Sequence, residues 1–193
     1  MPSYSRNSRI AVQVLRLAIA GAVQGGALLA GSVAHAADQP GKFVMTAYTD
    51  VVGGASLVSG DFQAALVQTQ HSKAPDDVIA TNRCVAYTMT GQIAAAKTVC
   101  DDAVADAKHD LMHATPPMLW EMSRLQEYLA VAYSNRAVLN WLSHDAAAAE
   151  RDLAEAGSLA PKAEFVARNI SALHSPHENR ENALAQATAT PDR

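Results

Sequence analysis

Apolar residues in the C-terminal half of the chain recur at the spacing of one helix face. Residues 162–173 (KAEFVARNISAL) place four apolar side chains together on such a face: Phe165, Val166, Ile170 and Leu173. A longer apolar-periodic run extends from Pro117 to Leu142, and a proline is tolerated in the first turn of a helix, where its missing amide hydrogen would have no acceptor. The pattern favours one long helix over residues 117–142, with two shorter helices as the alternative, and predicts a terminal helix over residues 162–173.

Composition strengthens the helical prediction. Hydrophobic residues make up 49% of the chain and aromatic residues only 5%. Much of the apolar content is alanine, the best helix former, whereas a sheet protein of this size would contain more aromatic and β-branched residues. We therefore expect an all-α fold.

Two segments of the chain read as copies of one helical hairpin. Residues 82–104 and residues 135–161 both begin with Asn-Arg, carry a small residue two places after the asparagine, and contain a break between two helical runs. Residues 51–70 form an earlier and weaker copy. The three turns fall at Gly60, Gly91 and His144, so the intervals of 31 and 53 residues indicate an insertion in the second one.

These copies resemble the tetratricopeptide repeat family, whose unit of about 34 residues is a helix-turn-helix with small residues where its helices touch. The middle copy carries the resemblance in these residues: Asn82, Cys84, Ala86, Tyr87, Gly91, Ala96, Ala103 and Val104. The last copy carries it in these: Tyr133, Asn135, Ala137, Ala149, Leu153, Ala156 and Pro161. It departs from the family pattern at Asn140, where an aromatic residue is usual, and at His144, where glycine is usual.

The resemblance covers roughly residues 46–173 and implies a short right-handed solenoid of stacked hairpins. Within a domain spanning 37–173, it places hairpins at about 46–70, 78–106 and 117–161 and a capping helix at 162–173. The polar residues 174–193 have no apolar period, and we expect a disordered tail there. The alternative fold is an unrelated alanine-rich helical bundle.

Repeats of this family present the first helix of each hairpin along a concave surface. By register, the resemblance places seven apolar residues near that groove: Leu57, Val58, Val85, Met89, Val138, Trp141 and Leu142. Such a groove would accept an extended peptide or an amphipathic helix. The charged clamp for peptide tails known in some relatives is not expected, because Asp50 and Gly54 stand where the first repeat would supply a cation and an amide, although Asn82 and Asn135 are present.

The chain has two cysteines, Cys84 and Cys100, which exclude a four-cysteine metal site and are spaced too widely for a CxxC redox motif. In the resembled fold their positions lie close across one hairpin, which implies a disulfide within the distance range such bonds need. Two buried reduced thiols are the alternative.

The N-terminus has the pattern of a secretory signal. Arg6, Arg9 and Arg16 precede the first acidic residue, an apolar stretch follows over residues 17–34, and Ala34-His35-Ala36 has the small-x-small form of a cleavage site. The stretch is interrupted by Gln24, Gly25 and Gly26, which disfavours a spanning helix, although an uncleaved anchor is the alternative. We expect residues 1–36 to be a signal peptide cut after Ala36, and a periplasmic or secreted mature chain without a stable membrane span.

The charge balance argues against nucleic-acid binding. The chain has 15 Lys and Arg and 19 Asp and Glu, a formal net charge of −4. Without residues 1–36 the balance becomes 12 basic against 19 acidic residues, or −7, whereas phosphate binding needs clustered cations.

Candidate catalytic chemistry is sparse. The sequence has no glycine-rich phosphate loop, nucleophile elbow or HExxH motif. If residues 109–113 are helical, His109 and His113 share a face beside Met112, but two imidazoles are an incomplete metal site, and we expect a solvated linker there. No catalytic residue, metal or cofactor is predicted.

The function expected from these observations is that of an exported, non-catalytic interaction module that binds a protein or peptide partner in a bacterial cell envelope. Two alternatives remain: a small periplasmic helical carrier of a metal or apolar ligand, and an accessory subunit of an envelope enzyme. A carrier would show convergent ligands or a closed apolar cavity.

Overall fold

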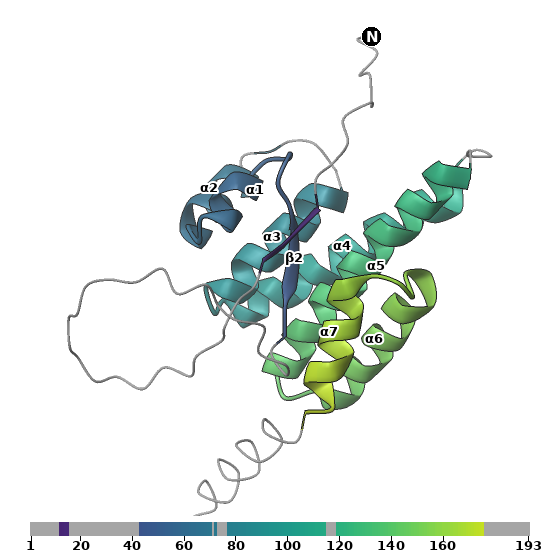
Figure 1. Ribbon diagram of the computed structural model, residues 1–193. Helices are drawn as coiled ribbons and strands as arrows, with labels where there is room; N and C mark the ends of the chain where they lie inside the picture. Colours follow the sequence, from purple (N-terminus) through teal and green to yellow (C-terminus); the bar gives the residue numbers. More distant parts are fainter. Residues whose placement is uncertain (1–11, 16–42, 71, 73–76, 115–118, 176–193) are drawn as a thin grey trace, which may run out of the picture.

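Seven helices and two short strands form the part of the chain that the computed structural model describes, residues 12–15, 43–70, 72, 77–114 and 119–175 (Figure 1). In chain order they are β1 (Val12–Leu15), β2 (Met45–Tyr48), α1 (Gly54–Val58), α2 (Phe62–Gln70), α3 (Asp77–Met89), α4 (Ile93–His113), α5 (Leu119–Leu142), α6 (Ala146–Leu159) and α7 (Glu164–Leu173). The predicted all-α class is confirmed. Except for β1, the expected signal peptide lies outside the described residues, as does the expected tail beyond Ser175.

The helices pair in sequence as α1 with α2, α3 with α4 and α5 with α6, while α7 packs against α5 and α6. The three predicted turns join these pairs, and Gly60, Gly91 and His144 have left-handed φ angles of 81°, 72° and 62°. At each turn the amide of the left-handed residue donates a hydrogen bond to the carbonyl three residues before it. The amide of the following residue donates to the carbonyl five residues before itself. Three Schellman motifs therefore end α1, α3 and α5 in the same way.

Replacing His144 with glycine should raise the free energy of unfolding by about 0.5–1 kcal/mol. A left-handed conformation costs a residue with a Cβ atom about 1–2 kcal/mol, partly offset by the greater chain entropy of glycine. Thermal unfolding of His144→Gly measures the gain. The matched control is Gly91→Ala, which should lose a similar amount because a Cβ atom there meets no other atom within 4 Å and only the backbone is affected. An unchanged midpoint for both variants would contradict the prediction.

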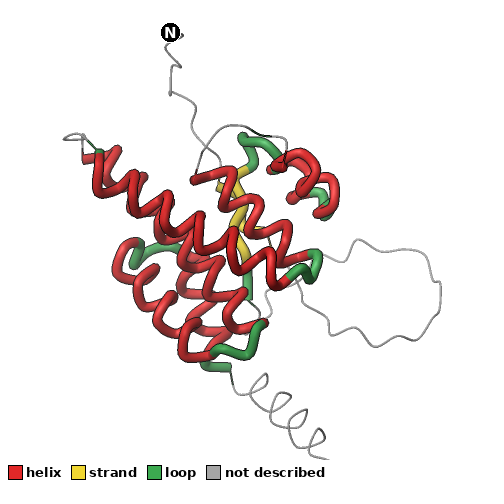
Figure 2. Tube along the Cα trace, turned by 180° about the vertical axis from the view of Figure 1, so that it is seen from behind, coloured by secondary structure: helices red, strands yellow, loops and turns green. Residues whose placement is uncertain are grey.

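The insertion in the second interval lengthens two helices. α4 has 21 residues and α5 has 24, and the two extend together away from the other helices (Figure 2). The expected single long helix is confirmed from Leu119 onward. The expected solvated linker around His109 is wrong, because α4 continues to His113. The prolines at 116 and 117 predict a break, but that break comes only after His113, so the polar residues before it stay helical.

Strand β2 is the main departure from the expected architecture. The first hairpin was expected to begin at residue 46, but residues 45–48 are extended and pair antiparallel with β1, with Met45 opposite Leu15 and Ala47 opposite Gln13. Residues 43–48 are all buried, and β2 packs against α1, α3 and α5 (Figure 1). Residues 43–48 read Phe-Val-Met-Thr-Ala-Tyr, and β-branched and aromatic residues of this kind favour a strand.

Candidate functional site: an asparagine ladder on strand β2

Three asparagines, one from each of α3, α5 and α7, hold strand β2 and the residue before it. Asn82 lies on α3, Asn135 on α5 and Asn169 on α7, and all three are fully buried. The Oδ1 atoms accept hydrogen bonds from the amides of Tyr48 (2.8 Å), Thr46 (2.8 Å) and Val44 (2.7 Å), respectively. The Nδ2 atoms donate to the carbonyls of the same three residues at 2.8, 2.8 and 2.9 Å. We call this arrangement the asparagine ladder.

The ladder contacts the backbone of every second residue. A carboxamide carries an acceptor and a donor side by side, so it can pair with the N–H and C=O of one residue, as a neighbouring strand would. In an extended chain the N–H and C=O groups of alternate residues point to the same edge, and residues 44, 46 and 48 present theirs to the helices. The ladder therefore holds an extended segment without reading its side chains.

Two further bonds fix the orientation of the amides. Asn169 Nδ2 also donates to Ser134 Oγ at 2.8 Å, and Ser134 precedes the ladder residue of the neighbouring hairpin. Asn82 Nδ2 donates to the Val52 carbonyl at 3.3 Å, in the turn after β2. Each of these two rungs is thus tied to a second segment of the fold as well as to the strand.

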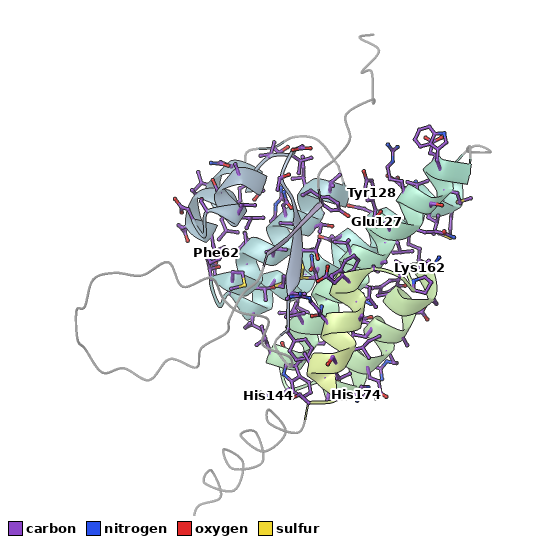
Figure 3. All side chains as sticks on the ribbon, viewed as in Figure 1. Phe62, Glu127, Tyr128, His144, Lys162 and His174 are labelled. Atoms are coloured by element: carbon purple, nitrogen blue, oxygen red, sulfur yellow. A yellow bond between two sulfur atoms is a disulfide. The ribbon has the colours of Figure 1, made fainter. Side chains whose placement is uncertain are left out.

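The side chains of residues 43–48 enter two parts of the core. Phe43, Met45 and Ala47 belong to the cluster that contains the disulfide, and the Phe43 ring lies 5.3 Å from that of Trp141. Val44 and Tyr48 belong to a second cluster. There the Tyr48 ring meets the Tyr128 ring edge-on at 5.2 Å, and Figure 3 shows Tyr128 on α5. The strand is therefore an integral part of the hydrophobic core.

The residues expected to line a binding groove lie around this strand. Leu57, Val85 and Val138 are buried in the same cluster as Met45. Met89, Trp141 and Leu142 are half-buried and pack against that cluster, and Val58 is 40% exposed. Trp141, which was expected to line the groove, has its ring packed on Phe43 instead. The face chosen from the sequence does hold an extended segment, which is the chain's own residues 43–48.

The arginines that follow two of the asparagines tie the helices together. Arg136 donates through Nε and Nη2 to the carboxylate of Asp152 on α6 (2.9 and 2.7 Å) and through Nη1 to Asp101 on α4 (2.9 Å). The hydrogen bonds with Asp152 raise the pKa of Arg136 above its ordinary value, against the opposing effect of burial. Arg83 donates to the Thr69 carbonyl near the end of α2. Each Asn-Arg pair thus holds the strand with one residue and neighbouring helices with the other.

Cys84 and Cys100 form a disulfide between α3 and α4, with Cα atoms 4.8 Å apart and both residues buried. The pairing implied by the repeat resemblance is confirmed. Because Asn82 lies two residues before Cys84, the cross-link fixes the helix that carries the first rung of the ladder.

His109 and His113 stack on α4 with ring centroids 4.0 Å apart, and His113 Nδ1 lies 2.9 Å from the His109 carbonyl oxygen. Both are exposed. No group of three or more His, Cys, Asp or Glu side chains that could hold a metal ion occurs in the described part of the chain.

Sequence reasoning noticed Asn82 and Asn135 but missed Asn169 and the strand they hold. A signal was present, because Asn169 follows Asn135 by 34 residues, the length of one repeat. The apolar face of residues 162–173 predicts a capping helix but does not reveal that Asn169 on this helix holds Val44.

Comparisons of the chain with protein-family models, with curated proteins and with solved structures found no match. Among the described residues, no helix combines the length and apolar character needed to cross a bilayer.

Proposed function

We propose that this chain is an exported, non-catalytic helical-repeat protein of the tetratricopeptide type that binds a protein partner in the bacterial cell envelope. The observation that carries the proposal is the asparagine ladder. Helices α3, α5 and α7 each present a buried asparagine to alternate residues of one extended segment, here the chain's own residues 44–48, so this helical face is built to hold peptide backbone.

Two features support the export step of this proposal. The N-terminal pattern of three arginines, an apolar stretch and Ala34-His35-Ala36 is that of a cleavable signal. The buried disulfide between Cys84 and Cys100 is of a kind that persists in oxidising compartments such as the periplasm. Together they favour a mature chain that starts at Ala37.

Site-specific photo-crosslinking in intact cells tests the function. A photoreactive residue at Val58, exposed on α1 beside β2, should give a discrete adduct in the envelope fraction, identified by mass spectrometry and confirmed by reciprocal capture with the tagged partner. The matched control carries the same group at Glu150, exposed on α6, and should give no such adduct. Intact mass should show Ala37 at the N-terminus. Equal labelling from both positions, or retention of Met1, would contradict the proposal.

A further inference from the structure

Strand β2 has two edges, and the backbone N–H and C=O groups at both edges have hydrogen-bonding partners. The N–H and C=O groups of residues 44, 46 and 48 are taken by the asparagine ladder at one edge. Those of Met45 and Ala47 therefore point to the opposite edge, where β1 pairs antiparallel, with Leu15 opposite Met45 and Gln13 opposite Ala47.

The helices and β1, which flank β2 on opposite edges, differ in how firmly they are attached to it. The helices hold residues 43–48 through six buried hydrogen bonds and through side chains in two core clusters. β1 is a four-residue strand whose principal contacts are with β2 and α1. It also lies inside residues 1–36, the segment that the proposed export step removes. Displacing β2 would uncover the core, whereas losing β1 uncovers one strand edge.

We propose that, once β1 has been removed, the edge of β2 formed by Met45 and Ala47 accepts an extended, proline-free segment of a partner protein, aligned antiparallel in the place of β1. This proposal rests on the proposed function, because it requires the N-terminal segment to be cleaved. An exposed edge strand is a template for another strand, and addition of a strand is an established mode of peptide recognition.

The chemistry of the occupant follows from the register. The residues opposite Ala47 and Met45 each exchange two hydrogen bonds with β2, so proline cannot stand at either position. The strand that pairs there reads Val-Gln-Val-Leu, and a partner segment likewise needs residues that favour the extended conformation. The partner segment therefore needs at least four residues in extended form, and its backbone supplies the recognition.

The test uses the full chain with a specific protease site inserted between Ala36 and Ala37. The folded protein is cut, the N-terminal fragment is separated by gel filtration, and circular dichroism checks that helix content is kept. A fluorescent peptide of residues 10–17 (IAVQVLRL) is then added, and binding is followed by anisotropy. The cut chain should bind the peptide, and the uncut chain should not, because β1 occupies the edge within the same molecule.

Two N-methylated peptides form the matched pair. Methylation of the Gln13 amide, which faces β2, should weaken binding at least tenfold. Methylation of the Val14 amide, which points away from β2, should change affinity by less than about threefold. This difference separates backbone pairing from attraction between apolar side chains.

Five outcomes would overturn the inference. The helices could unfold when the fragment leaves, the peptide could bind cut and uncut chain equally, or both N-methylated peptides could bind alike. The cut chain could also become a dimer that excludes the peptide, which would make a second copy the occupant. If the peptide fails to bind while the Val58 adduct persists, only this inference is refuted. If the peptide binds but cells give no Val58 adduct, the envelope function is refuted instead.

Discussion

Replacing Asn135 with alanine should lower the free energy of unfolding by about 3 kcal/mol. The substitution removes both the acceptor for the Thr46 amide and the donor for the Thr46 carbonyl, each 2.8 Å away. Thr46 is 1% exposed, so water cannot replace the lost partner without opening the core. A buried polar group left unpaired costs about 1–3 kcal/mol, and here two groups are affected.

Urea unfolding followed by circular dichroism measures this change, and hydrogen exchange at the Thr46 amide shows whether the loss is local. The control is Glu127→Ala on the same helix, where the side chain is exposed (Figure 3) and the change should stay within about 0.5 kcal/mol. If Asn135→Ala is as stable as the control, β2 is held by side-chain packing alone and the ladder has no energetic role.

The turns of the fold could be predicted from the sequence because their causes are local. Gly60 and Gly91 stand where the backbone is left-handed, a conformation that glycine adopts without steric cost. His144 was placed in the same role by its spacing within the repeat, and it does have a positive φ. Helix-breaking polar residues next to these positions also indicate that a helix ends there.

The place of strand β2 could not be predicted in this way because its partners are far along the chain. The Thr46 amide is held by a residue 89 positions later and the Val44 amide by one 125 positions later. The sequence pattern within residues 43–48 gives no indication of hydrogen bonds to residues so far along the chain. The repeat register instead assigned residues from 46 onward to the start of a helical hairpin, so the sequence offered no strand to fill the face where residues 43–48 lie.

Because residues 43–48 fill the expected groove, substitutions of its lining residues affect folding as well as partner binding. Val85 and Val138 have no exposed surface to offer, because Met45 and Ala47 share their core cluster. Truncating Trp141 would disturb its contact with Phe43 as well as any partner. Variants on this face therefore report on folding first, and exposed positions such as Val58 are better suited to detect binding.

Removing the cross-link between Cys84 and Cys100 should lower the free energy of unfolding by about 3 kcal/mol. The bond closes a loop with a sequence separation of 16, and the chain-entropy model gives about 3 kcal/mol for a loop of this size. Urea unfolding of the oxidised and the reduced wild-type chain isolates the bond itself, since both contain the same atoms apart from two hydrogens.

The double variant Cys84→Ala/Cys100→Ala serves as the matched comparison, and it should be less stable still because it also leaves space where two buried sulfur atoms packed. Reduction should loosen α3 against α4, and since Asn82 precedes Cys84 by one half-turn, exchange of the Tyr48 amide that it holds should become faster. The Val44 amide, held by Asn169 on α7, provides the internal reference. Equal unfolding midpoints for oxidised and reduced chain would show that packing between α3 and α4 alone positions the first rung of the ladder.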